Sequence, residues 1–266
     1  MWFLYLCTSM QIEFYKYQGT GNDFIFIDNR EMGFDKENSQ LVASMCDRKF
    51  GVGADGLILL EDHPTAHFKM VYFNADGNLS SMCGNGGRCI VHFAKFLGLI
   101  SSEANFEAVD GMHAATIDGE HVRLKMNDVL DVSISEDFVF LNTGSPHHVA
   151  LVPQLEQFDV YSEGKKIRNL IYGKEGANVN FVAPEGNNTF SVRTYERGVE
   201  DETLSCGTGV TAVAIAMHAI GKASSETIGL KTPGGNLQVS FDKVDSVYTN
   251  VYLMGPAKQV FKGIWS

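Results

Sequence analysis

The chain has 266 residues, of which 44% are hydrophobic and 20% are charged, a composition typical of a globular protein with a substantial core. Its 32 acidic and 21 basic residues give a formal net charge of -11, so its electric field would repel a phosphate backbone, and we expect no nucleic-acid partner. No apolar run approaches the roughly 18 residues that a membrane span requires, so no membrane partner is expected.

The first nine residues, MWFLYLCTS, are apolar but lack the positive charge and the small-residue cleavage site of a signal peptide. We interpret residues 1–9 as a short extension ahead of a working sequence that begins near Met10. The five cysteines are odd in number and form no C-x-x-C pair, which argues against a disulfide framework and against a zinc site. A cytoplasmic location and no bound metal are therefore expected.

The predicted elements occur twice in the same order. In the first half, a turn at Gly21 leads into three strands (FIFID, GLILL, FKMVYF), a polar turn and a helix opened by Cys83 in Cys-Gly-Asn-Gly. In the second half, the strands HVALV, VNFVA and FSVRTY precede a helix opened by Cys206 in Cys-Gly-Thr-Gly. Gly98 and Gly221 are expected to end the two helices, and a hairpin then closes each half.

The two halves align at a shift of 206 − 83 = 123 residues. With this shift, 6 of the 11 glycines between positions 21 and 111 fall on another glycine, whereas the overall glycine content of 27 in 266 predicts about one. The second helix is apolar on almost every side from Val210 to Ile220, which predicts that it is buried.

The duplication predicts an α/β (α+β) fold of two pseudo-symmetric lobes, each a mixed sheet wrapped around a central helix. We place the N-terminal lobe at residues 1–119, with a C-terminal tail of residues 253–266 packed on it. The C-terminal lobe is expected at residues 120–252.

Cys83 and Cys206 each lie at the start of a predicted helix, where unsatisfied N–H groups and the helix dipole favour an anion. A helix N-terminus can lower a cysteine pKa from about 8.5 by a unit or more, so we expect one thiolate to act as a base near neutral pH. The adjacent glycines let the backbone offer N–H groups to a ligand carboxylate. Two such helix starts facing each other would flank one carbon, so that one sulfur removes a proton and the other delivers one to the opposite face.

The cysteines and the glycine-rich strings also have simpler interpretations than a pair of proton-transferring sulfurs. Cys7, Cys46 and Cys89 are expected to be inert buried thiols. A redox pair of Cys83 and Cys206 is an alternative, but nothing in the sequence shows that the two sulfurs can touch. The string GVGADG fits the dinucleotide pattern G-x-G-x-x-G but leads into a strand. The string GTGVTA, which starts at Gly207, opens a helix but follows a charged loop. No dinucleotide site is therefore expected.

The ordered strings GTGNDF, GVGADG, FNADG, MCGNGGRC, GSPHHV, GANVNF, YERG and SCGTG resemble the diaminopimelate epimerase family from Met10 onward. The resemblance implies epimerisation of LL-2,6-diaminopimelate to the meso form, without pyridoxal phosphate or any other cofactor, in the route to lysine and peptidoglycan precursor. It makes Cys83 and Cys206 the catalytic pair. It implies that the substrate is contacted, in part through backbone N–H groups at the two helix starts, by Asn22, Asn74, Gly84, Asn85, Ser145, Asn178, Glu196, Arg197, Gly207 and Thr208.

The resemblance also implies that His147 and Glu196 tune the thiols and that the protein forms a homodimer. Ser145 and Gly56 depart from the family pattern, because many members carry asparagine at the first position and some carry glutamine at the second. The stretch from Glu196 to Cys206 is one residue longer than in some relatives.

Several of these residues also suit ordinary structural roles. Asn22 and Asn74 are typical turn residues, and a lone histidine such as His147 before a strand is often a structural hydrogen-bonding group. Glu196 and Arg197 together would suit a solvated ion pair. Arg88 is expected to be a surface charge.

Two other functions fit the same residues. A proline or hydroxyproline racemase is similar in fold and in its two cysteines, but such enzymes typically carry histidine where this chain has Asn85, and they need no arginine to hold a distal carboxylate. A non-catalytic amino-acid-binding relative is the second alternative. The phenazine-biosynthesis type of isomerase shares the fold but does not need paired cysteines.

Overall fold

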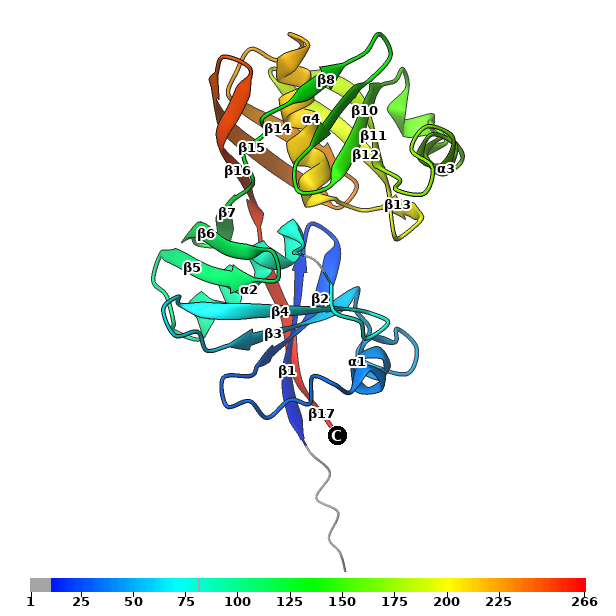
Figure 1. Ribbon diagram of the computed structural model, residues 1–266. Coiled ribbons are helices and arrows are strands. Elements are labelled where there is room, and N and C mark those ends of the chain that lie inside the picture. Colours follow the sequence, from blue (N-terminus) through cyan, green and yellow to red (C-terminus); the bar gives the residue numbers. More distant parts are fainter. Residues whose placement is uncertain (1–10, 81) are drawn as a thin grey trace, which may run out of the picture.

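The computed structural model describes residues 11–80 and 82–266, so Cys7 and the extension predicted for residues 1–9 lie outside the described residues. Figure 1 shows two lobes joined through β7 (His121–Lys125) and the long strand β16 (Val247–Pro256). These two strands pair antiparallel, so one hydrogen-bonded sheet network of 17 strands runs through both lobes.

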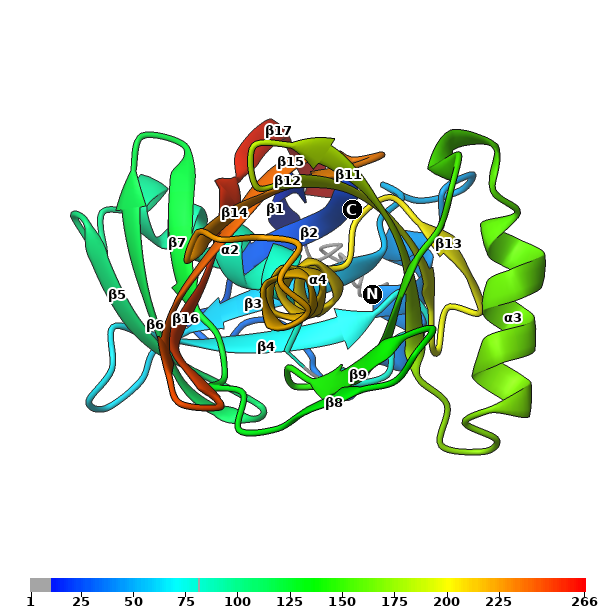
Figure 2. The same ribbon diagram turned by 90° about the horizontal axis from the view of Figure 1, so that it is seen from above.

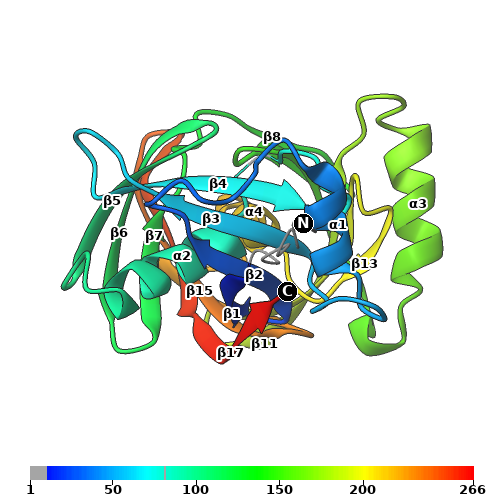
Figure 3. The ribbon, with the colours of Figure 1, turned by 90° about the horizontal axis from the view of Figure 1, so that it is seen from below.

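The first lobe is a mixed sheet curved around α2. Strand β1 pairs antiparallel with β2 and β17, β2 pairs parallel with β3, and the remaining strands follow in chain order to β7. Figure 3 shows α2 among these strands and α1 on the outside of the lobe. The elements are β1 (Ile12–Gly19), β2 (Asn22–Asp28), α1 (Ser39–Cys46), β3 (Gly56–Glu61), β4 (Phe68–Asn74), α2 (Gly84–Phe96), β5 (Glu103–Ala108), β6 (Gly111–Asp118) and β17 (Lys258–Trp265).

The second lobe repeats this arrangement around α4, and Figure 2 shows this helix enclosed by the strands. Strand β10 pairs antiparallel with β9 and parallel with β11, as β2 does with β1 and β3. The elements are β8 (Val132–Ile134), β9 (Val139–Asn142), β10 (Pro146–Leu151), a 3-10 turn (Leu155–Gln157), α3 (Val160–Leu170), β11 (Asn178–Gly186), β12 (Thr189–Glu196), β13 (Asp201–Thr203), α4 (Gly207–Ala219), β14 (Thr227–Thr232) and β15 (Gly235–Val244).

The predicted duplication is confirmed at the central helices. Both α2 and α4 have 13 residues, and their first and last residues are each 123 positions apart. Each helix ends two residues before a glycine in the left-handed conformation, Gly98 (φ 76°) and Gly221 (φ 70°), as the sequence predicted. Only glycine adopts this conformation without strain, which is why it ends both helices.

The two central helices fill separate hydrophobic cores. Every residue of α4 from Val210 to Met217 is buried, in agreement with its uniformly apolar sequence. Helix α2 contributes Ile90, Phe93 and Ala94 to the core of the first lobe. Each lobe thus buries its own apolar surface, and the lobes meet at the paired strands β7 and β16 and at the starts of the two helices.

Helices α1 and α3 were not predicted from the sequence. Both are short and lie on the outside of their lobes (Figure 1). Their starts carry side-chain caps, since Asn38 accepts a hydrogen bond from the Leu41 N–H and Asp159 accepts one from the Ser162 N–H. Asn38 and Asp159 are typical N-cap residues, so they were the sequence signal from which the starts of α1 and α3 could have been predicted.

The proposed boundary near residue 119 falls in the turn between β6 and β7, which pair with each other. We keep the division into residues 1–119 and 120–252, with the tail 253–266, as a proposal. Among residues 11–80 and 82–266, no helix has the length and apolar character needed to cross a membrane.

A close approach of the two lobes, at Gly234 and Thr20, predicts a specific loss of stability. A Cβ atom on Gly234 would lie 1.8 Å from the carbonyl oxygen of Thr20, so Gly234→Ala forces the two backbones apart. We expect it to lower the free energy of unfolding by about 2 kcal/mol, measured by urea denaturation. Gly33→Ala is the matched control, because a Cβ there meets nothing within 4 Å. Equal stabilities of the two variants would contradict the prediction.

Candidate active site

The two cysteines occupy equivalent positions at the starts of the central helices. Cys83 (φ −110°, ψ 124°) and Cys206 (φ −116°, ψ 114°) are both extended N-cap residues. Their carbonyl groups accept the first helical hydrogen bonds, from Gly87 N at 2.7 Å and from Val210 N at 2.9 Å. The placement of both sulfurs at helix starts, which the sequence predicted, is therefore confirmed.

The two helix starts meet directly through glycines. A Cβ atom on Gly207 would lie 3.2 Å from the Gly84 Cα and 3.6 Å from the Asn85 nitrogen. A Cβ at Gly207 would crowd the facing backbone, whereas one on Gly84 would lie 3.5 Å from the Gly207 Cα, so glycine matters most on the Gly207 side. The first N–H groups of each helix, including those of Gly84, Asn85, Gly207 and Thr208, therefore lie close together without helical acceptors, as an anion-binding site requires.

Burial raises the pKa of both thiols. Hydrogen bonds from the backbone N–H groups of Asn85 and Gly86 lower the pKa of Cys83, and hydrogen bonds from Thr208 and Gly209 lower that of Cys206. Desolvation is the larger effect on each thiol. The helix start therefore lowers the thiol pKa, as predicted, but burial outweighs it and the net pKa of each cysteine is raised. Burial thus favours the neutral thiol, and forming a thiolate requires further positive charge.

Asn22, which the resemblance implied as a substrate contact, lies against Cys83. Its Oδ1 accepts hydrogen bonds from the Cys83 sulfur at 3.5 Å and from the Asn85 side chain at 3.3 Å. Its Nδ2 donates to the carboxylate of Asp55, and this hydrogen bond fixes the orientation of the Asn22 amide. The Asn85 amide also donates to the Ser205 carbonyl at 3.0 Å, so it links the start of α2 to the segment before α4.

Asp55 is a residue of the site that the sequence analysis missed. It belongs to GVGADG, a string that was compared with a nucleotide motif and with the family pattern, but whose aspartate was given no role. Arg48 holds its carboxylate at 2.6 Å and contacts Asp23 at 2.7 Å. Although burial opposes ionisation, the hydrogen bonds from Arg48 and Lys16 lower the pKa of Asp23 to about 2. Asp23 therefore stays ionised beside Arg48, and Asp55, which Arg48 also contacts, holds the Asn22 amide toward Cys83.

Thr208 and Glu196 lie on the Cys206 side of the site. The Thr208 hydroxyl is 3.5 Å from the Cys206 sulfur, and the Thr203 hydroxyl donates to the Glu196 carboxylate at 3.0 Å. Burial raises the pKa of Glu196, and the negative charge of this carboxylate raises the pKa of both cysteines. Glu196 is therefore close enough to affect the two thiols.

Glu196 and Arg197 do not form the solvated ion pair that was an alternative. The Arg197 guanidinium donates to the Glu175 carbonyl at 2.9 Å, and its backbone N–H donates to Asn178 Oδ1 at 2.9 Å. Within the described part of the chain this exposed guanidinium contacts no carboxylate. It is available to bind the carboxylate of a ligand.

His147 is fully buried in β10, and its orientation is set by Asn180. The Asn180 amide oxygen accepts from Thr194 at 3.0 Å, so its Nδ2 faces His147 Nδ1 at 3.2 Å and the His148 carbonyl at 3.0 Å. Asn178 Nδ2 also lies 3.5 Å from His147 Nε2, so side-chain amide nitrogens face both ring nitrogens. Burial lowers the pKa of His147 to about 3, so the ring is neutral. The predicted tuning of the thiols by His147 stays a proposal.

Three further positions lie at the strand ends of the site. Asn74 is exposed at the end of β4, and Ser145 is partly buried just before β10. Their substrate contacts stay predictions. At Gly56 a Cβ would lie 2.4 Å from the Phe73 carbonyl and 2.5 Å from the Tyr72 ring, so this backbone arrangement accepts no larger residue and leaves no room for a glutamine.

Cys46, Cys89 and Arg88 are all buried. Burial raises the pKa of Cys46 and of Cys89 to about 12, which agrees with their prediction as inert thiols. Arg88 is 0% exposed, so the prediction of a surface charge is wrong. Its position in a helix with an apolar face gave no sign of a buried cation.

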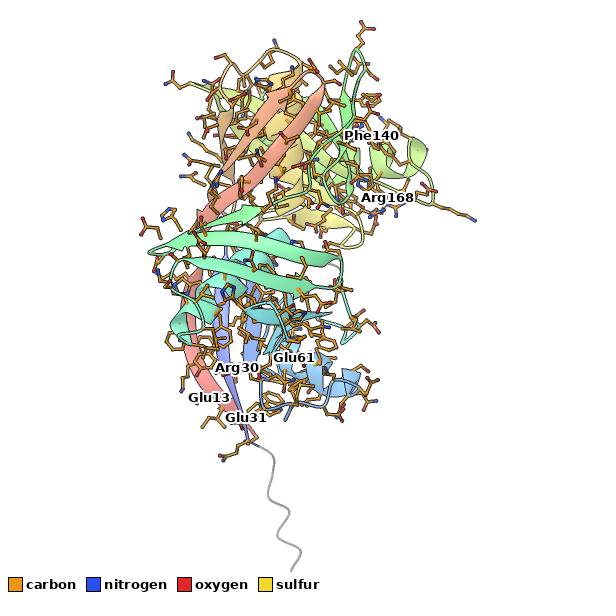
Figure 4. The ribbon with its side chains drawn as sticks, turned by 60° about the vertical axis from the view of Figure 1, so that its left-hand side comes forward. Glu13, Arg30, Glu31, Glu61, Phe140 and Arg168 are labelled. Atoms are coloured by element: carbon orange, nitrogen blue, oxygen red, sulfur yellow. The ribbon has the colours of Figure 1, made fainter. Side chains whose placement is uncertain are left out.

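The described residues hold no other group that matches the predicted chemistry. A hollow at the far end of the first lobe is lined in part by Glu13, Arg30 and Glu31, which Figure 4 labels, but it includes none of the predicted site residues. No cluster of three or more potential metal ligands occurs within residues 11–80 and 82–266. The paired helix starts are therefore the candidate active site.

The buried His147 predicts a pH dependence of stability. An unfolded histidine has a pKa of about 6.5, so the unfolded state binds more protons, and unfolding becomes easier as the pH falls from about 6.5 toward 3. We expect His147→Gln to reduce this dependence by about 1.4 kcal/mol per pH unit, measured by urea unfolding between pH 7 and 4. The exposed His121, replaced by Gln, serves as the control. An unchanged slope in His147→Gln would show that the ring is protonated in the folded protein.

Solved structures of low sequence identity share the fold. A phenazine biosynthesis protein of the PhzF family from Bacillus anthracis is 13% identical and superposes with a TM-score of 0.78, covering 97% of this chain and 99% of its own. A probable proline racemase from Agrobacterium radiobacter K84 is 15% identical with a TM-score of 0.70, covering 96% and 93%. These likenesses establish the two-lobed fold and do not distinguish among the functions.

Sequence similarity is more specific. The family described as diaminopimelate epimerase matches residues 14–130 and 139–260. A diaminopimelate epimerase from Flavobacterium psychrophilum is 56% identical over 253 residues, covering 94% of this chain and 99% of its own. The chain therefore belongs to the diaminopimelate epimerase family.

Proposed function

We propose that this protein converts LL-2,6-diaminopimelate to the meso isomer, with Cys83 and Cys206 as the acid and base on opposite faces of one α-carbon. The observation that carries the proposal is the direct contact of two helix starts, each capped by a cysteine, at Gly84 and Gly207. Family membership supports the substrate. No bound cofactor has a role in the proposed reaction.

The α-carboxylate of the substrate would bind at the free N–H groups of the two helix starts. When the α-proton leaves, negative charge spreads onto this carboxylate, and fixed N–H donors stabilise it more strongly than they stabilise the ground state. The buried Asn85 Oδ1 has no hydrogen-bond partner among the described residues, so it is available to accept from a substrate ammonium group.

The proton transfers balance without any external reagent. One cysteine, as a thiolate, takes the α-proton and becomes a thiol, while the other thiol gives its proton to the opposite face and becomes a thiolate. A turnover in the reverse direction starts from the state in which this other cysteine is the thiolate. Because both thiols have raised pKa values, the substrate ammonium group and nearby cations must stabilise the thiolate that starts the reaction.

The other end of diaminopimelate carries a second carboxylate and a second amine. The exposed Arg197, together with the amide of Asn178, suits the carboxylate, and the amide of Asn74 suits either group. A proline racemase would not need this cation. Ser145 offers a shorter hydroxyl in place of the usual amide, and we retain it as a substrate contact.

We also propose a cytoplasmic location and a homodimer. Two reduced thiols are needed for the reaction, and a cytoplasm keeps cysteines reduced. The described cysteines Cys46, Cys83, Cys89 and Cys206 are all free, which is consistent with this location. The homodimer rests on the family resemblance alone and stays a prediction.

Removing either sulfur tests the two-base reaction. We expect Cys83→Ala and Cys206→Ala each to lower kcat by at least about 1,000-fold, because one face of the carbon then has no proton donor or acceptor. Turnover is measured in deuterated water, where the active enzyme must place deuterium on the inverted carbon. Cys46→Ala, which removes a buried thiol from another core, is the control and should keep its activity. Full activity in either active-site variant would reject the scheme, and an unlabelled ligand with the wild-type protein would favour a binding protein.

Arg197 tests the choice of substrate. We expect Arg197→Met to raise KM for LL-diaminopimelate by about 10-fold or more, because one charge-assisted hydrogen bond to the distal carboxylate is lost. Arg30→Met is the matched control, since Arg30 pairs with Asp28 at the far end of the first lobe. Assays of the wild-type protein with LL-diaminopimelate and with proline complete the test. Turnover of proline alone would identify a racemase instead.

A further inference from the structure

Arg88 is a fully buried cation without a carboxylate partner among the described residues. It lies in α2, five residues after Cys83, and is 0% exposed. Taking an ionised guanidinium out of water is costly unless an anion or several hydrogen bonds compensate for the lost solvation. An arginine in such a place therefore needs a reason beyond packing.

The contacts of Arg88 keep its charge at the start of the helix. Its guanidinium donates to the Thr20 hydroxyl at 3.1 Å, and at 3.5 Å to the carbonyl oxygens of Gly84 and Pro256. All three partners are neutral oxygens. Because long helical side chains point toward the helix N-terminus, the positive charge lies beside the first turn, at the carbonyl of Gly84, the residue that follows Cys83. Gly255 leaves space for the guanidinium, since a Cβ at this position would lie 3.3 Å from Arg88 Nε.

The internal duplication provides a comparison within the same molecule. The position in α4 that corresponds to Arg88 is Thr211, and both side chains donate to the carbonyl of the first helical residue. The Thr211 hydroxyl reaches the Gly207 carbonyl at 2.9 Å. The hydrogen bond to the helix start is therefore present in both lobes, whereas the ionic charge is present only beside Cys83.

Other titratable groups face Cys83 from several elements. Glu196 on β12, Tyr72 on β4 and Cys206 before α4 would each oppose a negative charge on the Cys83 sulfur when ionised. Cys89 lies on the same helix and is a neutral thiol. Arg88 acts in the opposite direction to these groups and lowers the pKa of Cys83.

We infer that Arg88 is a positioning residue that supplies the fixed positive charge for the Cys83 thiolate, without itself touching the substrate. This inference rests on the proposed two-base function. It makes the two cysteines electrostatically unequal, although the scaffold that holds them is duplicated. The arginine cannot lose its proton at any accessible pH, so the charge is permanent.

The ionisation of Cys83 tests the inference directly. The full-length variant Arg88→Met is treated with iodoacetamide across a pH series, and alkylation of the Cys83 and Cys206 peptides is quantified by mass spectrometry. We expect the midpoint for Cys83 to rise by about one pH unit or more, with a smaller change for Cys206. Arg88→Lys should bring the Cys83 midpoint most of the way back to its wild-type pH, because lysine keeps the positive charge. Thr211→Val, which removes the equivalent neutral hydrogen bond, should leave the Cys83 midpoint where it is.

An unchanged Cys83 midpoint in folded Arg88→Met would overturn the inference and leave Arg88 as a structural residue. If this variant does not fold, Arg88→Gln takes its place, because it keeps hydrogen-bonding groups without the charge, and the same rise is expected. Alkylation is measured without turnover. A wild-type protein that fails to epimerise diaminopimelate would refute the proposed function, whereas the alkylation midpoints would separately test the role of Arg88.

Discussion

The close approach of two helix starts is the constraint on which the candidate site depends. Gly84 and Gly207 let the first turns of α2 and α4 pack backbone against backbone, which brings two sets of free N–H groups and two cysteine caps together. A side chain at Gly207 would crowd the facing backbone at Gly84. Each helix is otherwise held in its own apolar core, so the meeting point is fixed by two independently packed scaffolds.

The duplicated scaffold carries unequal polar groups. Buried His147 and Asn180 in the second lobe correspond, at the shift of 123 residues, to the apolar Phe24 and Leu57 in the first. Inversion of a carbon needs groups on two faces, which a duplicated fold supplies. The two thiols must nevertheless be in different protonation states at any moment, and the unequal surroundings give a physical basis for that difference.

A second layer of charged residues orients the groups that contact the sulfurs. The Asn22 amide faces Cys83 because Asp55 holds its other end, and Arg48 in turn holds Asp55. Such support keeps a polar side chain in one conformation and reduces the entropy lost on ligand binding. The glycine-rich string around Asp55 thus has a structural role in the site that its pattern alone does not indicate.

The sequence by itself determined the duplication, the paired strands, the two cysteine-capped helices and their glycine ends, because periodicity and turn chemistry are local properties of the chain. It also determined the family, since eight ordered strings are far more specific than any one of them. The tertiary structure alone decided the state of the thiols and the place of Arg88. Desolvation depends on every segment packed around a group, and local sequence carries the helix N-terminus but not the burial that outweighs it.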